Sequence, residues 1–399
     1  MAYSVFAHEA IIDANWEKVM LPLLREKYPG STAGQLKEAH AYAYGGAVVP
    51  DMGYYPFGSK LFTNLIHYVR SGDFVHALLG DAQTVQEYAF ALGVLCHYYA
   101  DMYGHSAGTN EAVPLMYPRM RRKYGDTVTY AEDRVSHVRT EFSFDVLQTV
   151  RGNYESTAYH DYIGFRVAQP LLEKAFRETY GLEAKELFGN FGRAIGMFRW
   201  TVINFFPVIT RTAWITQRMQ IRDQMPTARS RNFIYRVRQK NYIMLFDSTE
   251  EKPKRIAHLI SLIIRIAPKI GPLRVLRFRE PGPDAEKLFI QSFDTVVIYY
   301  TRSLNKLYGK NVELPNIDID TGKETSFGEY TLADKTYADL LLILQQKKFE
   351  TLTPELKGNI ISFYSNNYSP PITGRNAATW QRTQNALQQI RTINHPATQ

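Results

Sequence analysis

Apolar residues recur at intervals of three and four positions along most of this 399-residue chain. That spacing is typical of α-helices that bury one face. Clusters of Gly and Pro separate the periodic segments, as in YPGSTAG and VVPDMGYYPFGS. Strand-like alternation is confined to a doubtful stretch, NVELPNIDIDTGKETSFGEY, near 311–330. The pattern therefore predicts an all-α fold, with helices at about 8–27, 59–70, 83–106, 131–150, 157–179, 184–222, 284–308, 332–347 and 376–392.

Histidine and positive charge are distributed unevenly. Eight of the ten histidines precede residue 161, whereas residues 211–280 carry 16 Lys and Arg against 5 Asp and Glu. We therefore predict two regions, a histidine-rich domain of residues 1–205 and a helical C-terminal region of residues 206–399. In the basic segment, residues 211–280, the charges are interleaved with Phe, Tyr, Ile and Leu, which suits contact with an anionic surface of lipid or nucleic acid. A merely solvated face is the alternative interpretation.

Composition narrows the class of protein. With 45% hydrophobic and 13% aromatic residues, the chain can bury a sizeable core. The single cysteine, Cys96, excludes an internal disulfide framework and a Cys-rich zinc module. Its apolar helical surroundings favour a packed thiol over a nucleophile. No apolar run reaches the ~18 residues that a membrane span requires, so we expect no transmembrane segment. Nothing in the sequence indicates an oligomeric state.

The stretch LGVLCHYYADMYGHSAG places His97, Asp101 and His105 four residues apart. On an α-helix, side chains at this spacing climb one edge and drift by about 40° per step. Each of these residues alone would most often be a satisfied polar group in a core. Burying all three in an apolar helix is costly unless they are paired or bound to a cation. The spacing therefore indicates a metal site.

Further histidines and carboxylates precede residue 142, at the edges of the predicted helices. They are His8, Asp51 in the turn VVPDMGYYP, His67, and the pair His137 and Glu141, which repeats the four-residue spacing. Together with the central helix they give five histidines and three carboxylates and no thiolate. Imidazole and oxygen donors suit zinc, and a site without cysteine is typical of catalytic zinc.

These motifs resemble those of the zinc-dependent phospholipases C and D. The resemblance runs through AYGGAVVPD, LIHYVR, HYYADMYGHSAG as HxxxDxxxH, and HVRTE as HxxxE, and covers roughly residues 3 to 180. It is strongest with the catalytic domain of glycosylphosphatidylinositol-specific phospholipase D. Bacterial phospholipase C and the fungal single-strand zinc nucleases are more distantly similar. The expected fold is therefore a multi-helix catalytic domain of this type, followed by the basic helical region.

The resemblance implies three zinc positions. Asp51, His67, His97 and Asp101 correspond to the ligands of one zinc. Asp101 also corresponds to the bridge to a second zinc, which His8 and the amino terminus of the mature chain complete. His105, His137 and Glu141 correspond to the ligands of the third. Asp51 has two open roles, as a plain ligand and as the general base that assists the attacking water.

The implied activity is hydrolysis of a phosphodiester. Zinc lowers the pKa of bound water to about 7, so that it serves as a hydroxide nucleophile at neutral pH. We expect a phospholipid head group as substrate, with the basic segment against an anionic membrane. A single-strand nuclease and a zinc-stabilised binding protein without turnover are the alternatives. For a nuclease, an aromatic platform for bases could come from Tyr54, Tyr55, Tyr98, Tyr99 and Tyr103.

The resemblance also implies export. In the family, the mature amino terminus freed by signal-peptide cleavage ligates zinc and lies five residues before the first histidine. Counting back from His8 reaches Tyr3. We therefore expect a periplasmic or extracellular form that begins at Tyr3, whose free α-amine, with a pKa near 7.7–8.0, can bind zinc at neutral pH. The alternative is that YSVFA simply packs the entrance to the first helix.

Overall fold

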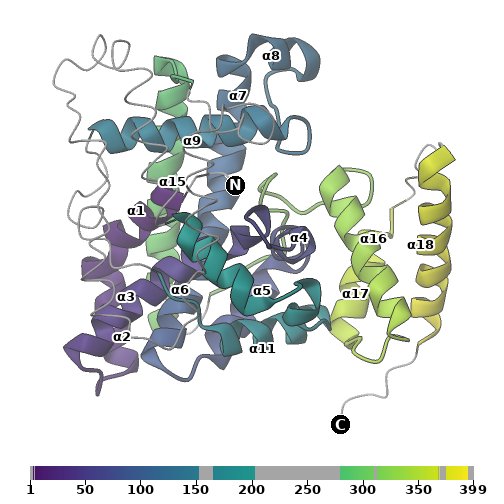
Figure 1. The fold of residues 1–399 in the computed structure, drawn as a ribbon, viewed down its shortest axis with the longest axis horizontal. Coiled ribbons are helices and arrows are strands. Elements are labelled where there is room, and N and C mark those ends of the chain that lie inside the picture. The colour runs from purple at the N-terminus through teal and green to yellow at the C-terminus, as the bar shows by residue number, and fades with distance from the viewer. Residues whose placement is uncertain are drawn as a thin grey trace.

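The computed structural model describes residues 3, 5–151, 165–202, 279–309, 312–366, 368 and 374–393. Regular structure in these residues is helical, and they contain no β-strand (Figure 1). The all-α prediction is thus confirmed. The doubtful strand near 311–330 is wrong, because this stretch makes only an isolated antiparallel bridge between Asp318 and Lys323.

The elements follow one another closely in the first half of the chain. They are α1 (Val5–Asn15), the π-helical turn η1 (Trp16–Met20), α2 (Leu21–Lys27), α3 (Ala33–Val48), the 3₁₀ turn η2 (Val49–Tyr54), α4 (Lys60–Tyr68), α5 (Ser71–Asp81), α6 (Val85–Gly104), the π-helical turn η3 (His105–Thr109), α7 (Asn110–Met116), α8 (Pro118–Tyr124) and α9 (Arg134–Arg151). The later elements are α11 (Gln169–Tyr180), the 3₁₀ turn η4 (Ala184–Leu187), a helical stretch over residues 191–202, α15 (Pro283–Tyr308), α16 (Thr331–Gln346), α17 (Pro354–Phe363) and α18 (Gly374–Thr392).

Local chemistry explains where the predicted helix bounds are wrong. Of the helix expected over 157–179, the described part begins only at Gln169, because Pro170 disfavours helical backbone in the preceding residues and fits the first turn instead. The helix expected over 184–222 is interrupted before residue 191. There the side chain of Asn190 accepts the backbone N–H of Arg193 at 2.8 Å and starts a new helix.

The centre of the fold is a close crossing of α3 and α6. Glycine lies at the contact on both helices: a Cβ on Gly46 would come within 2.0 Å of the carbonyl oxygen of Phe90, and one on Gly93 within 2.1 Å of that of Ala43. Only glycine allows backbones to approach this closely. The crossing brings the C-terminal end of α3, and the η2 turn after it, against the middle of α6.

Helix α6 is buried nearly all round. It begins with a capping box, in which the Thr84 hydroxyl accepts the N–H of Glu87 and the Glu87 carboxylate accepts that of Thr84. Most of its residues have little or no exposed surface, including Cys96, which is a free buried thiol as expected. A helix that is apolar on every side is the core helix of its domain.

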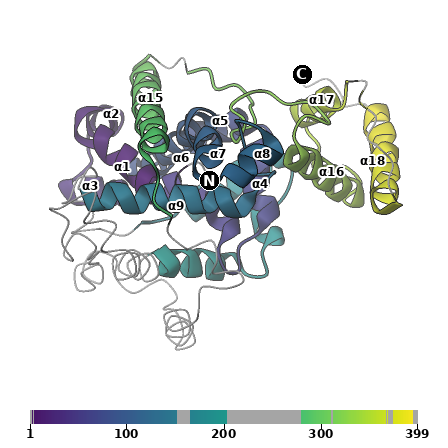
Figure 2. The ribbon, with the colours of Figure 1, turned by 90° about the horizontal axis from the view of Figure 1, so that it is seen from above.

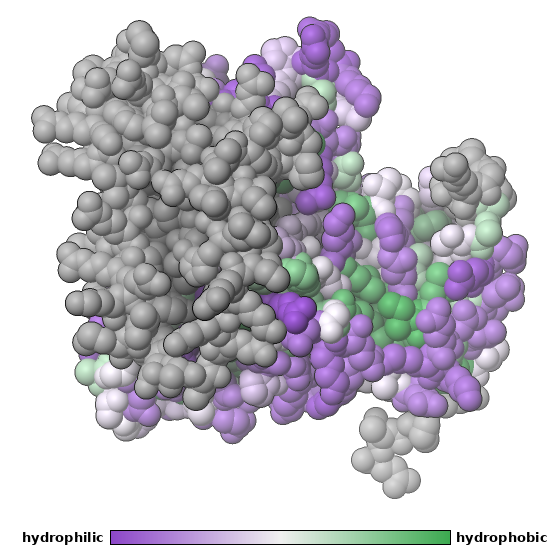
Figure 3. Space-filling view, viewed as in Figure 1, coloured by the Kyte–Doolittle hydropathy of each residue, from purple (hydrophilic) through white to green (hydrophobic). Residues whose placement is uncertain are grey.

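The later helices extend the same core. Helix α15 packs along α6, α7 and α1, and its buried residues belong to the same hydrophobic cluster as those of the first helices. Helices α16, α17 and α18 lie together at one side of the body in both views (Figures 1 and 2). Hydrophobic residues show on the surface over α16 and α17, whereas α8 is strongly hydrophilic (Figure 3).

Two further expectations concern the second half. The predicted division at residue 205 stays a prediction, and the basic segment 211–280 lies outside the described residues apart from its last two positions. Among the residues that the structure describes, no helix is long and apolar enough to cross a membrane.

Candidate metal centre

The eight side chains predicted to bind zinc come from separate elements and meet in the interior. Helix α1 supplies His8, η2 supplies Asp51 and α4 supplies His67. The remaining five are His97 and Asp101 on α6, His105 at the start of η3, and His137 and Glu141 on α9. None of the eight is more than 4% exposed. A cluster of this charge and burial requires internal neutralisation.

Four of these residues form one group. Asp51, His67, His97 and Asp101 each offer a ligand atom, and these atoms all lie within 4.8 Å of one another. His67 Nε2 is 3.3 Å from Asp101 Oδ2, and His97 Nε2 is 3.4 Å from the same oxygen. Asp51 Oδ1 lies 3.5 Å from His67 Nε2. This is the set that the sequence assigned to one zinc.

Backbone carbonyl groups orient the two imidazoles. His67 Nδ1 donates to the carbonyl oxygen of Thr63 at 2.8 Å, and His97 Nδ1 donates to that of Ala47 at 2.9 Å. With Nδ1 held by a carbonyl oxygen, each ring directs Nε2 into the group. Partners of this kind fix the tautomer of metal-binding histidines.

Asp101 is the centre of the whole arrangement. Besides His67 and His97, its carboxylate reaches His8 Nε2 at 3.2 Å and His105 Nε2 at 3.5 Å. The carboxylate therefore lies between all of these rings, as a ligand shared by two ions would.

The position of His8 depends on helix α9. Asp145 accepts the backbone N–H groups of Phe6 and Ala7 at 3.1 and 3.2 Å, and so satisfies the first turn of α1. The His8 ring then stacks on that of His97 with their centroids 4.7 Å apart. Tyr3 is buried just before α1, where its hydroxyl and Ser292 Oγ are 2.6 Å apart. Its predicted role as the first residue of a mature chain stays a prediction.

The second group contains the ligands assigned to the third zinc. His105, His137 and Glu141 offer ligand atoms within 4.8 Å of one another. His137 Nδ1 lies 2.7 Å from Glu141 Oε1, and its Nε2 lies 2.8 Å from Asn110 Oδ1. The chain widens into a π-helical turn at His105, a conformation frequently found at functional sites.

The sequence did not predict Asp320 or Asn110. Asp320 is 1% exposed, and together with Asp101 and His105 it forms a third group that could hold a metal ion. Asp320 ends the stretch NIDID, which is part of the doubtful strand-like segment near 311–330. Two aspartates alternating with isoleucines in a buried segment are a signal that would have marked this stretch.

Burial and the carboxylates act on the pKa values of the cluster in opposite directions. Burial alone would lower the pKa of His67, but its hydrogen bonds to Asp101 and Asp51 raise it to about 10. Burial lowers the pKa of His97 to about 4. It raises the pKa of Glu141 to about 8. Burial would also raise the pKa of Asp101, but the surrounding histidines hold it well below its usual value.

The donor set fits zinc. It consists of imidazole nitrogens and carboxylate oxygens, which are the ligands of catalytic zinc sites. Both ring nitrogens of His105 are buried and make no hydrogen bond with a described group. A cation bound by one of these nitrogens would supply a partner for it.

An arginine and two tyrosines border the cluster. The Arg134 guanidinium lies 5.6 Å from the ring centre of Tyr54 and 5.9 Å from that of Tyr130. The Tyr54 ring is 6.5 Å from that of His67, and the Tyr130 ring is 5.7 Å from that of His137. Arg134 is exposed, so its positive charge is available to an anion at this border.

The other tyrosines considered as a platform for bases lie elsewhere. Tyr99 and Tyr103 are on the opposite face of α6 from His97 and Asp101, and the Tyr103 ring stacks on that of Tyr299 of α15. Tyr98 is buried, and Tyr55 packs against Phe198. Of the five, Tyr54 alone has a ring contact with a candidate ligand among the described residues.

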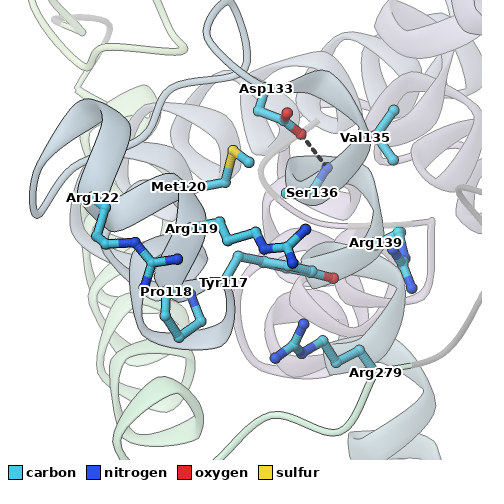
Figure 4. Close-up of a pocket in the computed structure, with 10 residues that line it drawn as sticks. All are labelled: Tyr117, Pro118, Arg119, Met120, Arg122, Asp133, Val135, Ser136, Arg139 and Arg279. Atoms are coloured by element: carbon cyan, nitrogen blue, oxygen red, sulfur yellow. Dashed lines mark hydrogen bonds between the residues drawn. The ribbon is translucent and has the colours of Figure 1, made fainter.

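A separate pocket of about 630 Å³ lies beside α8 and α9. Four arginines line it, together with Tyr117 and Asp133 (Figure 4); the arginines are Arg119, Arg122, Arg139 and Arg279. Arg139 lies on the face of α9 opposite to His137 and Glu141, and none of the predicted zinc ligands lines the pocket. The pocket is therefore distinct from the metal centre.

The family described as zinc-dependent phospholipase C matches residues 7–190. The match includes all eight predicted zinc ligands and ends before α15 and Asp320. No curated protein and no solved structure matches the chain.

Proposed function

We propose that the protein is a zinc-dependent hydrolase that cleaves phospholipid head groups at a phosphodiester bond, because residues 7–190 match the family described as zinc-dependent phospholipase C. The observation that supports this most is the Asp101 carboxylate, which lies within 3.5 Å of four imidazoles. The three groups that could hold a metal ion, two of which contain Asp101, support a centre of up to three zinc ions.

The residues of the chain would divide the work of hydrolysis. When bound, zinc supplies Lewis acidity and an activated water at neutral pH. Asp51, at 4% exposure, is the most accessible of the eight ligands and lies in a short turn rather than within a long helix. This position suits the general base that accepts a proton from the attacking water. Arg134, at the border of the cluster, would bind a phosphate oxygen.

The arrangement of aromatic residues favours a lipid over a nucleic acid. A single-strand nuclease needs bases stacked near the metal ions, and among the described residues only Tyr54 of the five candidate tyrosines has a ring contact with a candidate ligand. The strong positive charge of residues 211–280 and the arginine-lined pocket support an anionic membrane surface as partner. We also propose that the protein acts outside the cytoplasm. This proposal rests on the resemblance of the segment before His8 to the mature amino terminus of the exported family members. Met1 and Ala2 lie outside the described residues.

The proposal is tested by assaying zinc-loaded protein on a phosphatidylcholine analogue and on single-stranded DNA. We expect hydrolysis of the lipid analogue and its loss in Asp101→Asn. The matched control is Asp13→Asn, which changes a half-buried carboxylate that holds His40 outside the cluster. Cleavage of DNA alone would favour the nuclease. Full zinc loading with turnover of neither substrate would favour a binding protein.

A further inference from the structure

A carboxylate from the second half of the chain reaches the metal ligands. Asp320 follows Glu141 by about 180 residues, yet its Oδ1 lies 3.2 Å from Nε2 of His105. Neither of these two buried atoms makes a hydrogen bond, with the other or with another described group. A buried donor or acceptor left in this state costs about 1–3 kcal/mol. A cation held by both atoms would remove that cost.

The other oxygen of the same carboxylate is firmly held. Asp320 Oδ2 accepts hydrogen bonds from the hydroxyl groups of Tyr68 at 2.7 Å and Tyr330 at 2.8 Å. Tyr68 follows the candidate ligand His67 on α4. Two donors on one oxygen fix the plane of the carboxylate and leave Oδ1 directed at His105. Carboxylates that ligate metal ions are held by hydrogen bonds of this kind.

Asn110 connects Asp320 to the second group of ligands. Its Nδ2 donates to the backbone carbonyl oxygen of Asp320 at 3.0 Å, and its Oδ1 lies 2.8 Å from His137 Nε2. One amide side chain therefore positions both the backbone of the late segment and an imidazole of the cluster. Asp320 and His137 therefore share Asn110 as a partner.

The segment around Asp320 is docked along its length on α4, α5 and α6. Tyr98 donates its hydroxyl proton to the carbonyl oxygen of Pro315, and Ser71 Oγ donates to that of Ile317. The N–H of Ile319 donates to the carbonyl oxygen of His67 at 3.1 Å. Gly322 closes the turn with a φ of +74°. The position of Asp320 is thus set by the backbone and does not depend on a single side-chain contact.

We propose that Asp320 is a ligand of the zinc ion bound by His105, and that this ion fastens residues 315–322 to the metal-binding helices. Zinc accepts carboxylate oxygen beside imidazole nitrogen, and a further carboxylate balances more of the positive charge of a dication. The inference rests on the zinc centre of the proposed function. It adds to that centre a ligand that lies beyond residues 7–190, the part of the chain that matches the family.

The test measures zinc content and amide hydrogen exchange in the full chain. Asp320→Asn should bind about one zinc ion fewer than wild type, and zinc should no longer slow exchange over residues 315–322. The matched control is Asp318→Asn in the same turn. Asp318 Oδ1 accepts the N–H groups of Asp320 and Thr321, and an asparagine oxygen can replace it. This control should keep both the zinc content and the zinc-dependent protection.

A milder variant covers the case in which Asp320→Asn does not fold. Tyr330→Phe keeps the carboxylate and removes one of its two donors, and it should weaken zinc binding at this position by about 10–100-fold. Wild-type zinc content and zinc-dependent protection in Asp320→Asn, or unchanged zinc affinity in Tyr330→Phe, would overturn the proposal. Zinc-dependent protection that is lost in Asp320→Asn, in a protein that hydrolyses no phosphodiester, would support the ligand while refuting the hydrolase.

Discussion

His97 Nδ1 donates to the backbone carbonyl oxygen of Ala47 across the contact between α6 and α3, over 2.9 Å. This bond forms because two glycines, Gly46 and Gly93, let the helices approach closely. The orientation of the candidate ligand His97 therefore depends on Gly93, one turn earlier on α6, and on Gly46 of α3, neither of which has a side chain. The close packing of α3 and α6 therefore determines how His97 faces the metal centre.

Gly93→Ala should damage both stability and metal binding. The added methyl group would lie 2.1 Å from the carbonyl oxygen of Ala43, so the helices must separate. We expect a loss of about 3 kcal/mol in the free energy of unfolding and weaker zinc binding, because the bond from His97 is broken. Denaturant unfolding and zinc titration measure the two effects.

The control for this prediction is Gly80→Ala on α5. No heavy atom lies within 4 Å of a Cβ at that position. Replacing a helical glycine there should stabilise the protein by about 0.5 kcal/mol. An equal effect of the two substitutions would show that the crossing does not require glycine.

Asp145→Ala should displace His8 without touching the metal ligands directly. The carboxylate of Asp145 accepts two N–H groups of the first turn of α1. Its removal should cost about 1–2 kcal/mol, as the loss of a helix cap does. We expect zinc affinity to fall together with stability. Asp145→Asn keeps one acceptor oxygen, so its stability and zinc affinity should lie between those of wild type and Asp145→Ala. Retention of wild-type zinc affinity in Asp145→Ala would contradict the role given to α1.

Arg134→Gln should raise the KM for an anionic phosphodiester with little change in kcat. Arg134 lies on the same face of α9 as His137 and Glu141, and its charge faces the border of the cluster over Tyr54 and Tyr130. Steady-state kinetics on a small soluble substrate are the measurement. Arg139→Gln, on the opposite face of the same helix, is the control and should leave KM unchanged. The same rise in both variants would point to a general effect of net charge.

Asp334 should make stability depend on pH between about 4 and 6. Burial raises the pKa of this carboxyl group to about 6, above its ordinary 3.8, while the N–H of Gly328 donates to it. The folded state therefore holds the proton more tightly, and stability falls as the pH rises from about 4 to 6. Because the group is only half-buried, we expect about 1 kcal/mol for this loss.

The measurement is denaturant unfolding of wild type and Asp334→Asn at pH 4 and pH 7. The variant should be more stable than wild type at pH 7 and equal to it at pH 4. Asp339→Asn, on the exposed side of the same helix beside Lys335, serves as control and should show no such gain. A gain of the same size at both pH values would exclude the carboxyl group as the cause.

The spacing of residues along the chain predicted those parts of the fold and of the metal centre that lie within a single helix. His97 and Asp101 on α6, and His137 and Glu141 on α9, lie one turn apart as the four-residue spacing requires. Helix α3 escaped prediction because its residues AYAYGGAV are small and buried on several sides, so no single apolar stripe marks it.

Long-range docking decided what the sequence did not predict. Asp320 reaches His105 only because Ser71, Tyr98 and the carbonyl group of His67 hold residues 315–319 on the helices. No periodicity within the NIDID stretch contains that information. Similarly, Tyr99 and Tyr103 lie two residues before and two residues after Asp101 but face α15, because a step of two residues on a helix leads to the opposite face.

The distance in sequence between Asp320 and the other candidate ligands has a consequence for synthesis of the chain. A ribosome that has reached residue 151 has already made His8, Asp101, His105 and Glu141. At about 5–20 residues per second, Asp320 follows roughly 10–40 s later. During that interval the nascent protein contains the histidines and carboxylates of the cluster without Asp320 and, until residue 308 is added, without the complete helix α15, which packs on α1, α6 and α7. Because Asp320 is translated after all the other candidate ligands, the docking of residues 315–322 would complete the centre.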